Sequence, residues 1–218
     1  MNRNTDPMEQ SADPARDAAL PEQILALWFG QARPDNASAL QHKLQWFTKS
    51  PDFDAQLQQR FGAAVQAAQQ GRLRHWAAQG AWQRLALVLL LDQFGRNIFR
   101  HTPQSFAGDA QALSLALEAR ELGADLELPE VARVFMYLPL EHAEDPAMQE
   151  RSVALFEALL QAAPDAATRD YLAGSLDYAR RHREVIERFG RFPHRNAILG
   201  RPSTAAELAY LAQPGSGF

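Results

Sequence analysis

Apolar residues recur at every third or fourth position in almost every segment of this chain, and no segment of useful length alternates apolar and polar residues. Residues 53–68 show the spacing most clearly, with Phe53, Leu57, Phe61 and Val65 on one side of a helix. A period near 3.6 is that of an amphipathic helix, whereas a half-buried strand has a period of 2. The pattern therefore predicts an all-α protein of about ten helices, stacked as antiparallel pairs.

Start and stop signals divide this pattern into segments. The helix expected over residues 81–99 is apolar nearly all round from 85 to 91, so we expect it to be the most buried. Pro139 is expected to end the helix before it, and Thr204 and Glu207 have the spacing of a capping box. We expect helices over residues 21–29, 38–47, 51–70, 72–80, 81–99, 112–122, 131–138, 147–160, 168–189 and 204–211.

The ends of the chain differ from its middle in composition. Residues 1–20 are polar and contain two prolines, which predicts a disordered N-terminal tail. Residues 21–213 are long enough for one sizeable core, so we expect a single helical domain there. Residues 214–218, Gly-Ser-Gly-Phe after a proline, are expected to be a frayed C-terminus.

Composition excludes several classes of partner and of site. The formal net charge is −4, so we predict neither nucleic acid nor a membrane as a partner. The chain has no cysteine, which excludes disulfides, zinc–thiolate sites and thiol nucleophiles. The longest apolar run, residues 85–91, is too short to span a bilayer, and residues 1–17 lack the apolar stretch of a signal peptide. We therefore predict a soluble cytoplasmic protein without a cofactor.

The stretch of residues 182–201 mixes basic and apolar side chains. Residues 180–201 contain seven arginines and two glutamates, a formal charge of +5. The interleaved apolar residues predict a loop held against a core, so these guanidinium groups need anionic partners. The three carboxylates of residues 141–145 are possible partners within the protein, and a ligand is another possibility.

Four polar segments carry the candidate site: residues 92–100, Asp109, residues 141–145 and residues 182–201. The excess of arginine favours an anionic small molecule or an acidic peptide as the ligand, with Arg191 expected to hold it. We expect the following residues to converge: Asp92, Arg96, Asp109, Glu141, His142, His182, Arg191 and Arg195. The candidate ligand-binding residues are Asp92, Gln93, Arg96, Asn97, Arg100, Asp109, Arg188, Arg191, His194, Arg195, Asn196 and Arg201.

Two other hypotheses stay open beside ligand binding. Glu141, His142 and Asp145, with His182 or His194, can form the acid–base pair of a hydrolase-like enzyme or of a metal-dependent one. The first three and His182 are thus the candidate catalytic residues, although their spacing matches no metal-site signature and we predict no metal. Alternatively, the basic and acidic segments neutralise each other in an ion-pair network that only braces a protein-interaction scaffold.

Four separated motifs indicate a family. Residues 91–100 read LDQFGRNIFR, residues 106–109 FAGD, residues 137–145 YLPLEHAED and residues 188–196 RFGRFPHRN. In this order they resemble the bacterial DUF924 family, and the resemblance covers roughly residues 21–213.

The resemblance has two departures and implies a fold rather than an activity. Gly95 stands where the family more often has proline, and Ala143 where it often has serine. The fold that the family implies is helical and tetratricopeptide-like, with a right-handed superhelical arrangement. The sequence has no 34-residue repeat signature, so this likeness concerns the stacking of helix hairpins.

Overall fold

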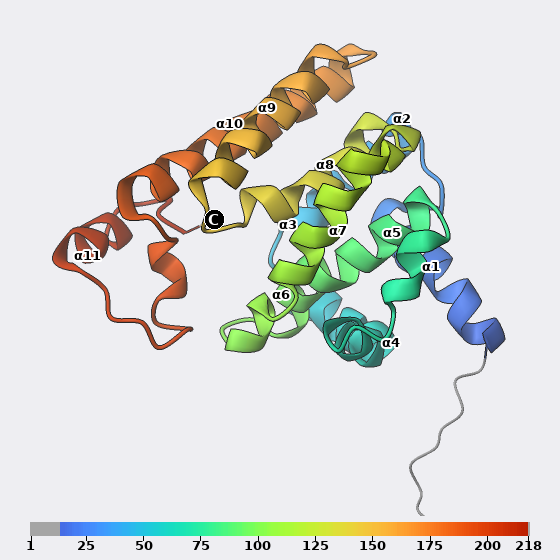
Figure 1. Ribbon diagram of the computed structural model, residues 1–218, viewed down its shortest axis with the longest axis horizontal. Coiled ribbons are helices and arrows are strands. Elements are labelled where there is room, and N and C mark those ends of the chain that lie inside the picture. Colours follow the sequence, from blue (N-terminus) through green and yellow to red (C-terminus); the bar gives the residue numbers. More distant parts are fainter. Residues whose placement is uncertain (1–13, 218) are drawn as a thin grey trace, which may run out of the picture.

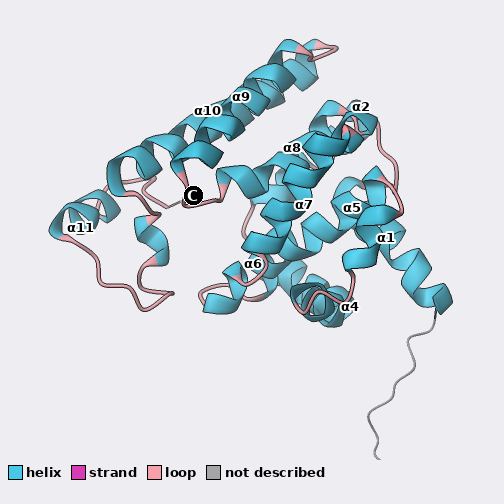
Figure 2. Cartoon of the chain, viewed as in Figure 1, coloured by secondary structure: helices cyan, strands magenta, loops and turns pink. Residues whose placement is uncertain are grey.

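The computed structural model describes residues 14–217, and within them every regular element is helical and none is a strand (Figures 1 and 2). Helices α5 and α6 are joined through the π-helical turn η2 into one continuous helix, so the prediction of about ten helices is confirmed. The α-helices are α1 (Pro14–Phe29), α2 (Asn36–Leu40), α3 (Lys43–Phe47), α4 (Pro51–Gln69), α5 (Ala81–Val88), α6 (Gly95–Ile98), α7 (Asp109–Leu122), α8 (Glu130–Glu141), α9 (Pro146–Gln161), α10 (Ala166–Phe189) and α11 (Ala205–Leu211). The shorter elements are η1 (Arg74–Ala78), η2 (Leu89–Phe94), η3 (Pro103–Phe106), η4 (Ala124–Glu127) and η5 (Pro193–Arg195).

Several helix ends follow directly from local chemistry. The Ser50 hydroxyl accepts a hydrogen bond from the backbone N–H of Phe53 and so caps α4. At the start of α11 both hydrogen bonds of the predicted capping box between Thr204 and Glu207 are present. Helix α10 ends at Gly190, whose φ of 69° is a left-handed conformation that glycine adopts without strain.

Several of the predicted helices differ from those observed, and the one predicted over residues 72–80 is the short 3-10 helix η1. Helix α1 begins at Pro14, so residues 14–20, predicted to be disordered, are helical; residues 1–13 lie outside the described part. Alanine-rich sequence favours the helix there, and Leu20 packs against the core. The helix predicted over residues 38–47 is divided into α2 and α3, because His42 has a ψ near 2° that interrupts the helix.

The end of α8 is a further difference, and it affects the site. Pro139 does not end this helix, which continues to Glu141 with His142 as its C-cap. The backbone N–H of His142 still donates to the carbonyl oxygen of Leu138, so the helical hydrogen bonds resume directly after the proline. Glu141 therefore belongs to a rigid helix and not to the loop that the proline predicted.

The core forms around the continuous helix α5–η2–α6 and around α8. Residues 84–95 are all buried, as predicted, and residues 134–141 of α8 are equally buried. Trp28 of α1 connects the two helices, because its ring centroid lies 5.5 Å from that of Phe94 in η2 and 5.5 Å from that of Phe135 in α8. α8 therefore shares the central position predicted for the first helix alone.

Helices α9 and α10 pack side by side in opposite directions (Figure 1). Arg180 pairs with Glu157, whereas Arg183, later in α10, lies 3.6 Å from Glu150, earlier in α9. Among the described residues, no helix is both long and apolar enough to cross a membrane. Beyond this pair and the all-α class, a tetratricopeptide-like superhelical order stays a prediction.

Candidate functional site

A π-helical turn and a close backbone contact position two acidic side chains. The turn η2 contains Asp92, which is fully buried. Gly108 lies so close to Leu91 that a Cβ atom on it would be 2.4 Å from the Leu91 carbonyl oxygen. Only glycine fits this contact, which brings Asp109 at the start of α7 beside η2. π-Helical turns within α-helices occur often at functional sites.

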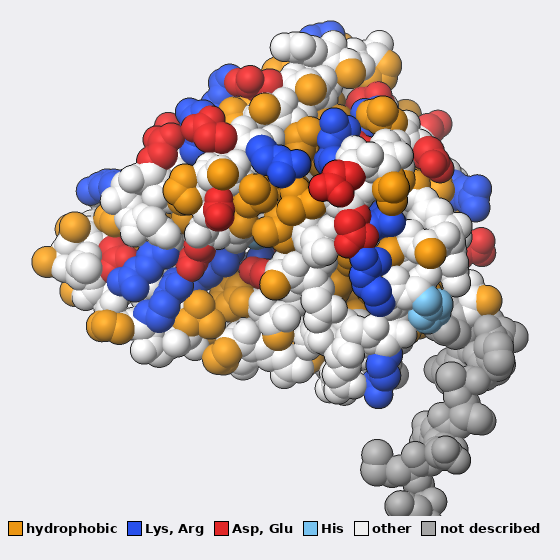
Figure 3. All heavy atoms as spheres, in the orientation of Figure 1, with side chains coloured by type: hydrophobic (Ala, Val, Ile, Leu, Met, Phe, Trp, Pro, Cys, Tyr) orange, Lys and Arg blue, Asp and Glu red, His pale blue; other side chains and the backbone are white. Residues whose placement is uncertain are grey.

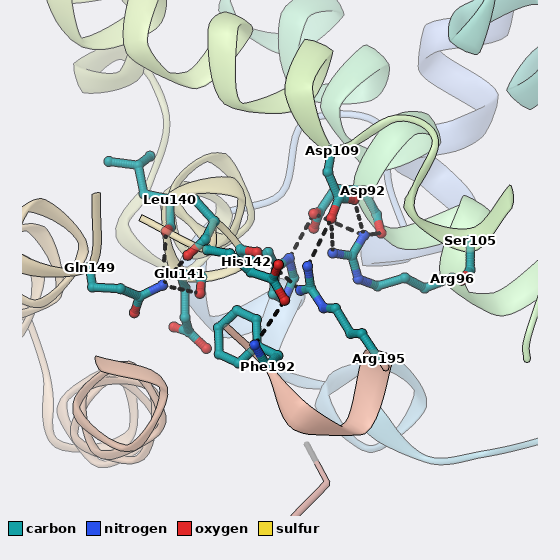
Figure 4. Close-up of polar contacts among 12 residues, drawn as sticks. Asp92, Arg96, Ser105, Asp109, Leu140, Glu141, His142, Gln149, Phe192 and Arg195 are labelled. Atoms are coloured by element: carbon teal, nitrogen blue, oxygen red, sulfur yellow. Dashed lines mark hydrogen bonds and ion pairs between the residues drawn. The ribbon is translucent and has the colours of Figure 1, made fainter. Parts of the chain in front are cut away.

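Asp92 is the centre of the polar cluster in Figure 4. Its Oδ1 atom lies 2.7 Å from Nδ1 of His142 and 3.2 Å from Nη1 of Arg96, and its Oδ2 accepts a 2.6 Å hydrogen bond from Gln93. Burial disfavours ionisation of this carboxyl, but the charge of Arg96 and the contacts with His142 and Gln93 outweigh it and hold the pKa of Asp92 well below its usual range. Asp92 is therefore a buried carboxylate.

Asp109 joins two arginines that come from distant parts of the chain. Arg96 donates to both of its carboxylate oxygens, at 2.9 and 3.0 Å. Arg195 of η5 reaches the same carboxylate at 3.4 Å and donates at 3.0 Å to the backbone carbonyl oxygen of His142 (Figure 4). The Arg195 guanidinium also lies 4.8 Å from the Phe106 ring centroid and 4.6 Å from that of Phe192.

Arg195 is the less neutralised of these two arginines. Its side chain is only 8% exposed, and its buried Nε atom has no hydrogen-bond partner. Burial and the neighbouring charge of Arg96 lower the pKa of Arg195 to about 10, against the opposing effect of Asp109. The group is still a cation at neutral pH, and it is held in an environment that lacks a full counter-charge.

His142 lies beside Asp92, and its backbone carbonyl oxygen accepts a hydrogen bond from Arg195. Burial and the charge of Arg96 lower its pKa below the usual value, although Asp92 acts in the opposite direction. The ring is therefore neutral at pH 7. Its hydrogen bond to Asp92 uses Nδ1, and in the described part of the chain no hydrogen bond reaches its Nε2. That second nitrogen is the one available to a ligand.

A second buried pair lies behind His142. Nδ1 of His182 is 3.1 Å from Oε1 of Glu141, and the two histidine ring centroids are 6.1 Å apart. Burial, followed by the charge of Asp92, raises the pKa of Glu141 well above its usual value, while burial and His142 lower the pKa of His182. Both shifts favour the uncharged form of the group.

A pocket of about 310 Å³ opens beside Arg195 and His142. It lies between the start of α7, the end of α8, the start of α9 and η5. Its wall includes apolar side chains from α7 and α8 as well as charged ones. The lining residues are Asp109, Ala110, Leu113, Pro139, His142, Ala143, Glu144, Asp145 and Arg195.

A separate network fixes the loop that follows α10. Arg201 donates to both carboxylate oxygens of Glu144, at 2.6 and 2.9 Å, and to the amide oxygen of Asn196. Arg191 donates to both oxygens of Glu207, at 2.7 and 2.9 Å. We call these four charged residues the brace. Acidic and basic side chains are interleaved over this C-terminal region on the face shown in Figure 3.

Seven of the eight residues predicted to converge do so, and Arg191 is the exception. It belongs to the brace, because Glu207 of α11 holds both ends of its guanidinium group. The His194 ring centroid lies 5.7 Å from that of Phe192, and burial and the nearby charge of Arg195 lower the pKa of His194 to about 4. The buried Asn196 links η5 to Ser203 and Arg201 within the brace.

Other predicted ligand-binding residues have partners elsewhere. Asn97 and Arg100 both donate to Asp54 of α4, a residue that the motifs did not single out. Arg188 is exposed and lies over the rings of Phe189 and Tyr210, beside a hollow of about 530 Å³ next to α11.

Asp145, a predicted catalytic residue, lines the pocket but serves as the N-cap of α9, since its Oδ1 accepts hydrogen bonds from two backbone N–H groups. Among residues 14–217 there is no group of three or more histidine and carboxylate side chains arranged to hold a metal ion. The pocket thus presents a guanidinium group, an imidazole nitrogen and carboxylates that already have partners.

Comparisons with known proteins agree with these motifs. The chain resembles the solved "Structure of Protein of Unknown Function ATU0120 from Agrobacterium tumefaciens", with 39% sequence identity over 89% of this chain and 98% of that one, and a TM-score of 0.73. A search of curated proteins found no match. The family model described as "Bacterial protein of unknown function (DUF924)" matches residues 24–215. The chain therefore belongs to the DUF924 family.

Proposed function

We propose that the pocket beside Arg195 binds a small molecule through an anionic group, a carboxylate or a phosphate. The observation that carries the proposal is the state of Arg195: a guanidinium group almost fully buried, with one 3.4 Å ion pair to a carboxylate that Arg96 already holds. A buried charge is costly without a full partner. An anion in the pocket supplies one through a charge-assisted hydrogen bond.

The start of α7 supports the same ligand chemistry. No side chain caps this 14-residue helix, whose N-cap is Gly108, and its first two residues, Asp109 and Ala110, line the pocket. The free N–H groups and the positive end of the helix dipole favour an anion. Together with the Arg195 guanidinium, these N–H groups give an anion hydrogen-bond donors from two elements, α7 and η5.

The size and charge of the pocket favour a small molecule over the acidic peptide that the sequence also allowed. A volume of about 310 Å³ lies at the small end for ligand pockets. Asp109, Glu144 and Asp145 lie around it, and they repel a chain of several acidic residues. A ligand with one anionic group and a short apolar part fits this pocket, with the apolar part against Leu113 and Pro139.

The purely structural alternative accounts for most of the arginine excess. Arg180, Arg183, Arg191 and Arg201 each have a carboxylate within 3.6 Å, so the formal charge of +5 is largely compensated by residues outside the stretch. In this alternative the ion pairs only stabilise a tetratricopeptide-like scaffold in the cytoplasm. Arg188 is exposed to water, whereas Arg195 is buried and this alternative gives it no adequate partner among the described residues.

A thermal-shift titration with sodium phosphate and with sodium succinate tests the proposal. Each is compared with sodium chloride at the same ionic strength, because salts also change stability without binding. A ligand at a hundred times its Kd stabilises the folded protein by about 2.7 kcal/mol. We expect Tm to rise for the natural protein and for Arg191→Gln, and the rise to disappear in Arg195→Gln.

Arg191→Gln is the matched control, since it removes the same charge four residues away. An anion-dependent rise that survives in Arg195→Gln, or that is lost in Arg191→Gln, contradicts the proposal. A natural protein that responds to neither anion contradicts it as well.

A further inference from the structure

Four titratable side chains lie in one buried row behind the pocket. Asp92 contacts His142 at 2.7 Å, the ring of His142 is 6.1 Å from that of His182, and His182 contacts Glu141 at 3.1 Å. A protein that only needed stability would gain by replacing such groups with apolar ones. Buried titratable groups next to a pocket are instead typical of acid–base chemistry.

The orientation of His142 is the feature that points to a reaction. Asp92, a buried carboxylate, fixes the His142 ring through Nδ1. His142 lines the pocket, and among the described residues no hydrogen bond uses its Nε2. The same division of labour occurs wherever a carboxylate orients a histidine that acts as a general base. Within the described residues, no serine or threonine and no cysteine lines this pocket, so the partner of Nε2 is a water molecule or the ligand itself.

We propose that this pocket hydrolyses a small carboxylic ester that also carries an anionic group, with His142 as the general base and Asp92 as its positioning residue. The inference rests on the proposed function, because Arg195 and the start of α7 hold the anionic group. The apolar wall formed by Ala110, Leu113 and Pro139 accommodates the short carbon chain between that group and the ester. The substrate class is thus a monoester of a short dicarboxylic acid.

The steps balance without any further reactant. Nε2 of His142 takes a proton from water while the water oxygen forms a bond to the ester carbonyl carbon. The carbonyl electrons move to oxygen, and they return as the bond to the alkoxy oxygen breaks. That oxygen takes the proton from the imidazolium, so the products are a dicarboxylate, the alcohol and one proton from the new acid. During the reaction Asp92 stabilises the imidazolium.

Charged groups on every side of His142 bear on its protonation. Three of these groups affect the pKa of His142: Asp92 from η2, Arg96 from α6 and Asp109 from α7. His182 comes from α10, and the charge of His142 affects its pKa. Arg195 and His194 face it from η5. Since the positive groups and burial favour the neutral ring, the base is already unprotonated at pH 7.

The inference is tested with the monomethyl esters of malonate, succinate and glutarate, whose hydrolysis is monitored by NMR of the released methanol. We expect kcat/KM to rise with pH through the lowered pKa of His142 and to be level near pH 7. His142→Gln should lose at least about 100-fold in kcat, the usual range for a general base. Succinate should still raise its Tm, because Arg195 is unchanged.

Other outcomes separate this inference from the proposed function. If succinate binds in an Arg195-dependent way and none of the three esters is hydrolysed, the inference is wrong and the binding proposal stands. If succinate does not bind, both are wrong. Hydrolysis that His142→Gln leaves intact also overturns the inference.

Diethyl pyrocarbonate gives a second measurement that is independent of the ester chosen, since it acylates neutral imidazole nitrogens. We expect His142 to be modified at pH 7, to be protected by succinate, and to react at least about tenfold more slowly in Asp92→Asn, where no carboxylate supports the ring. Asp145→Asn, at the rim of the same pocket, is the matched control and should leave the rate unchanged. An inert His142 would overturn the inference.

Discussion

Arg191 and Arg195 lie four residues apart, yet their surroundings are opposite. The Arg191 side chain is 29% exposed and is held by both oxygens of Glu207, at 2.7 and 2.9 Å. The Arg195 side chain is 8% exposed and has a single 3.4 Å contact to a carboxylate. The more deeply buried cation has the poorer partner. Stability alone would arrange them the other way, since an unpaired charge costs most where water is excluded.

The carboxyl groups repeat this contrast. Hydrogen bonds from Arg191 and from the Thr204 backbone hold the pKa of Glu207 at about 2, so the brace keeps its carboxylate ionised. In the buried row behind the pocket, by contrast, burial and the charge of Asp92 raise the pKa of Glu141. The brace consists of charges that neutralise one another, whereas the row behind the pocket contains groups whose pKa values are displaced by burial and by neighbouring charges. The two regions therefore differ in how far their charges are neutralised within the protein.

The largest effect is expected from removing the charge at the centre of the pocket cluster. Asp92→Ala leaves Arg96 and His142 without their buried partner and should lower the free energy of unfolding by about 3–5 kcal/mol, the usual cost of breaking a buried pair. Urea denaturation measures it. Asp145→Ala, which removes an exposed helix cap at the same pocket, should cost about 1 kcal/mol. Equal costs for the two variants would mean that Asp92 is not the centre of the cluster.

A smaller effect, in the brace, depends on pH. The folded-state pKa of both Glu144 and Glu207 is lowered, so each carboxylate stabilises the fold above its unfolded pKa of about 4.5. That stability is lost as the pH falls through the folded-state values, which for Glu207 means between about 4.5 and 2. Urea denaturation from pH 5 to pH 2 should show this loss. The double variant Glu144→Gln/Glu207→Gln should show a weaker dependence on pH over the same range, and an unchanged slope would contradict the account of the brace.

The all-α fold could be predicted because the helical period runs through the whole chain and the caps are local. Ser50, Gly190 and the capping box of Thr204 act through residues within a few positions, so the sequence contains their signal. The errors arose where distant packing prevailed. Pro139 lies within a buried helix, and Leu20 attaches residues 14–20 to the core. Neither the burial of Pro139 within α8 nor the packing of Leu20 against the core has a signature in the local sequence.

The site was predictable as a group of polar residues near apolar anchors, but the partners within it were not. Charge counting could not distinguish Arg191 from Arg195, because the carboxylate of Glu207 comes from a helix that the motifs did not include. The π-helical turn that contains Asp92 has no recognisable pattern. The dyad of Asp92 with His142 joins residues 50 positions apart, so only the fold could pair them.

The most direct test of the contrast is a phosphate titration followed by NMR of the arginine Nε–H groups and the histidine rings, assigned with Arg191→Gln, Arg195→Gln and His142→Gln. We predict that the signals of Arg195 and His142 move together with one binding constant, while that of Arg191 stays in place. Signals of Arg191 that move with the same constant, or signals of Arg195 and His142 that do not respond at all, would contradict the account.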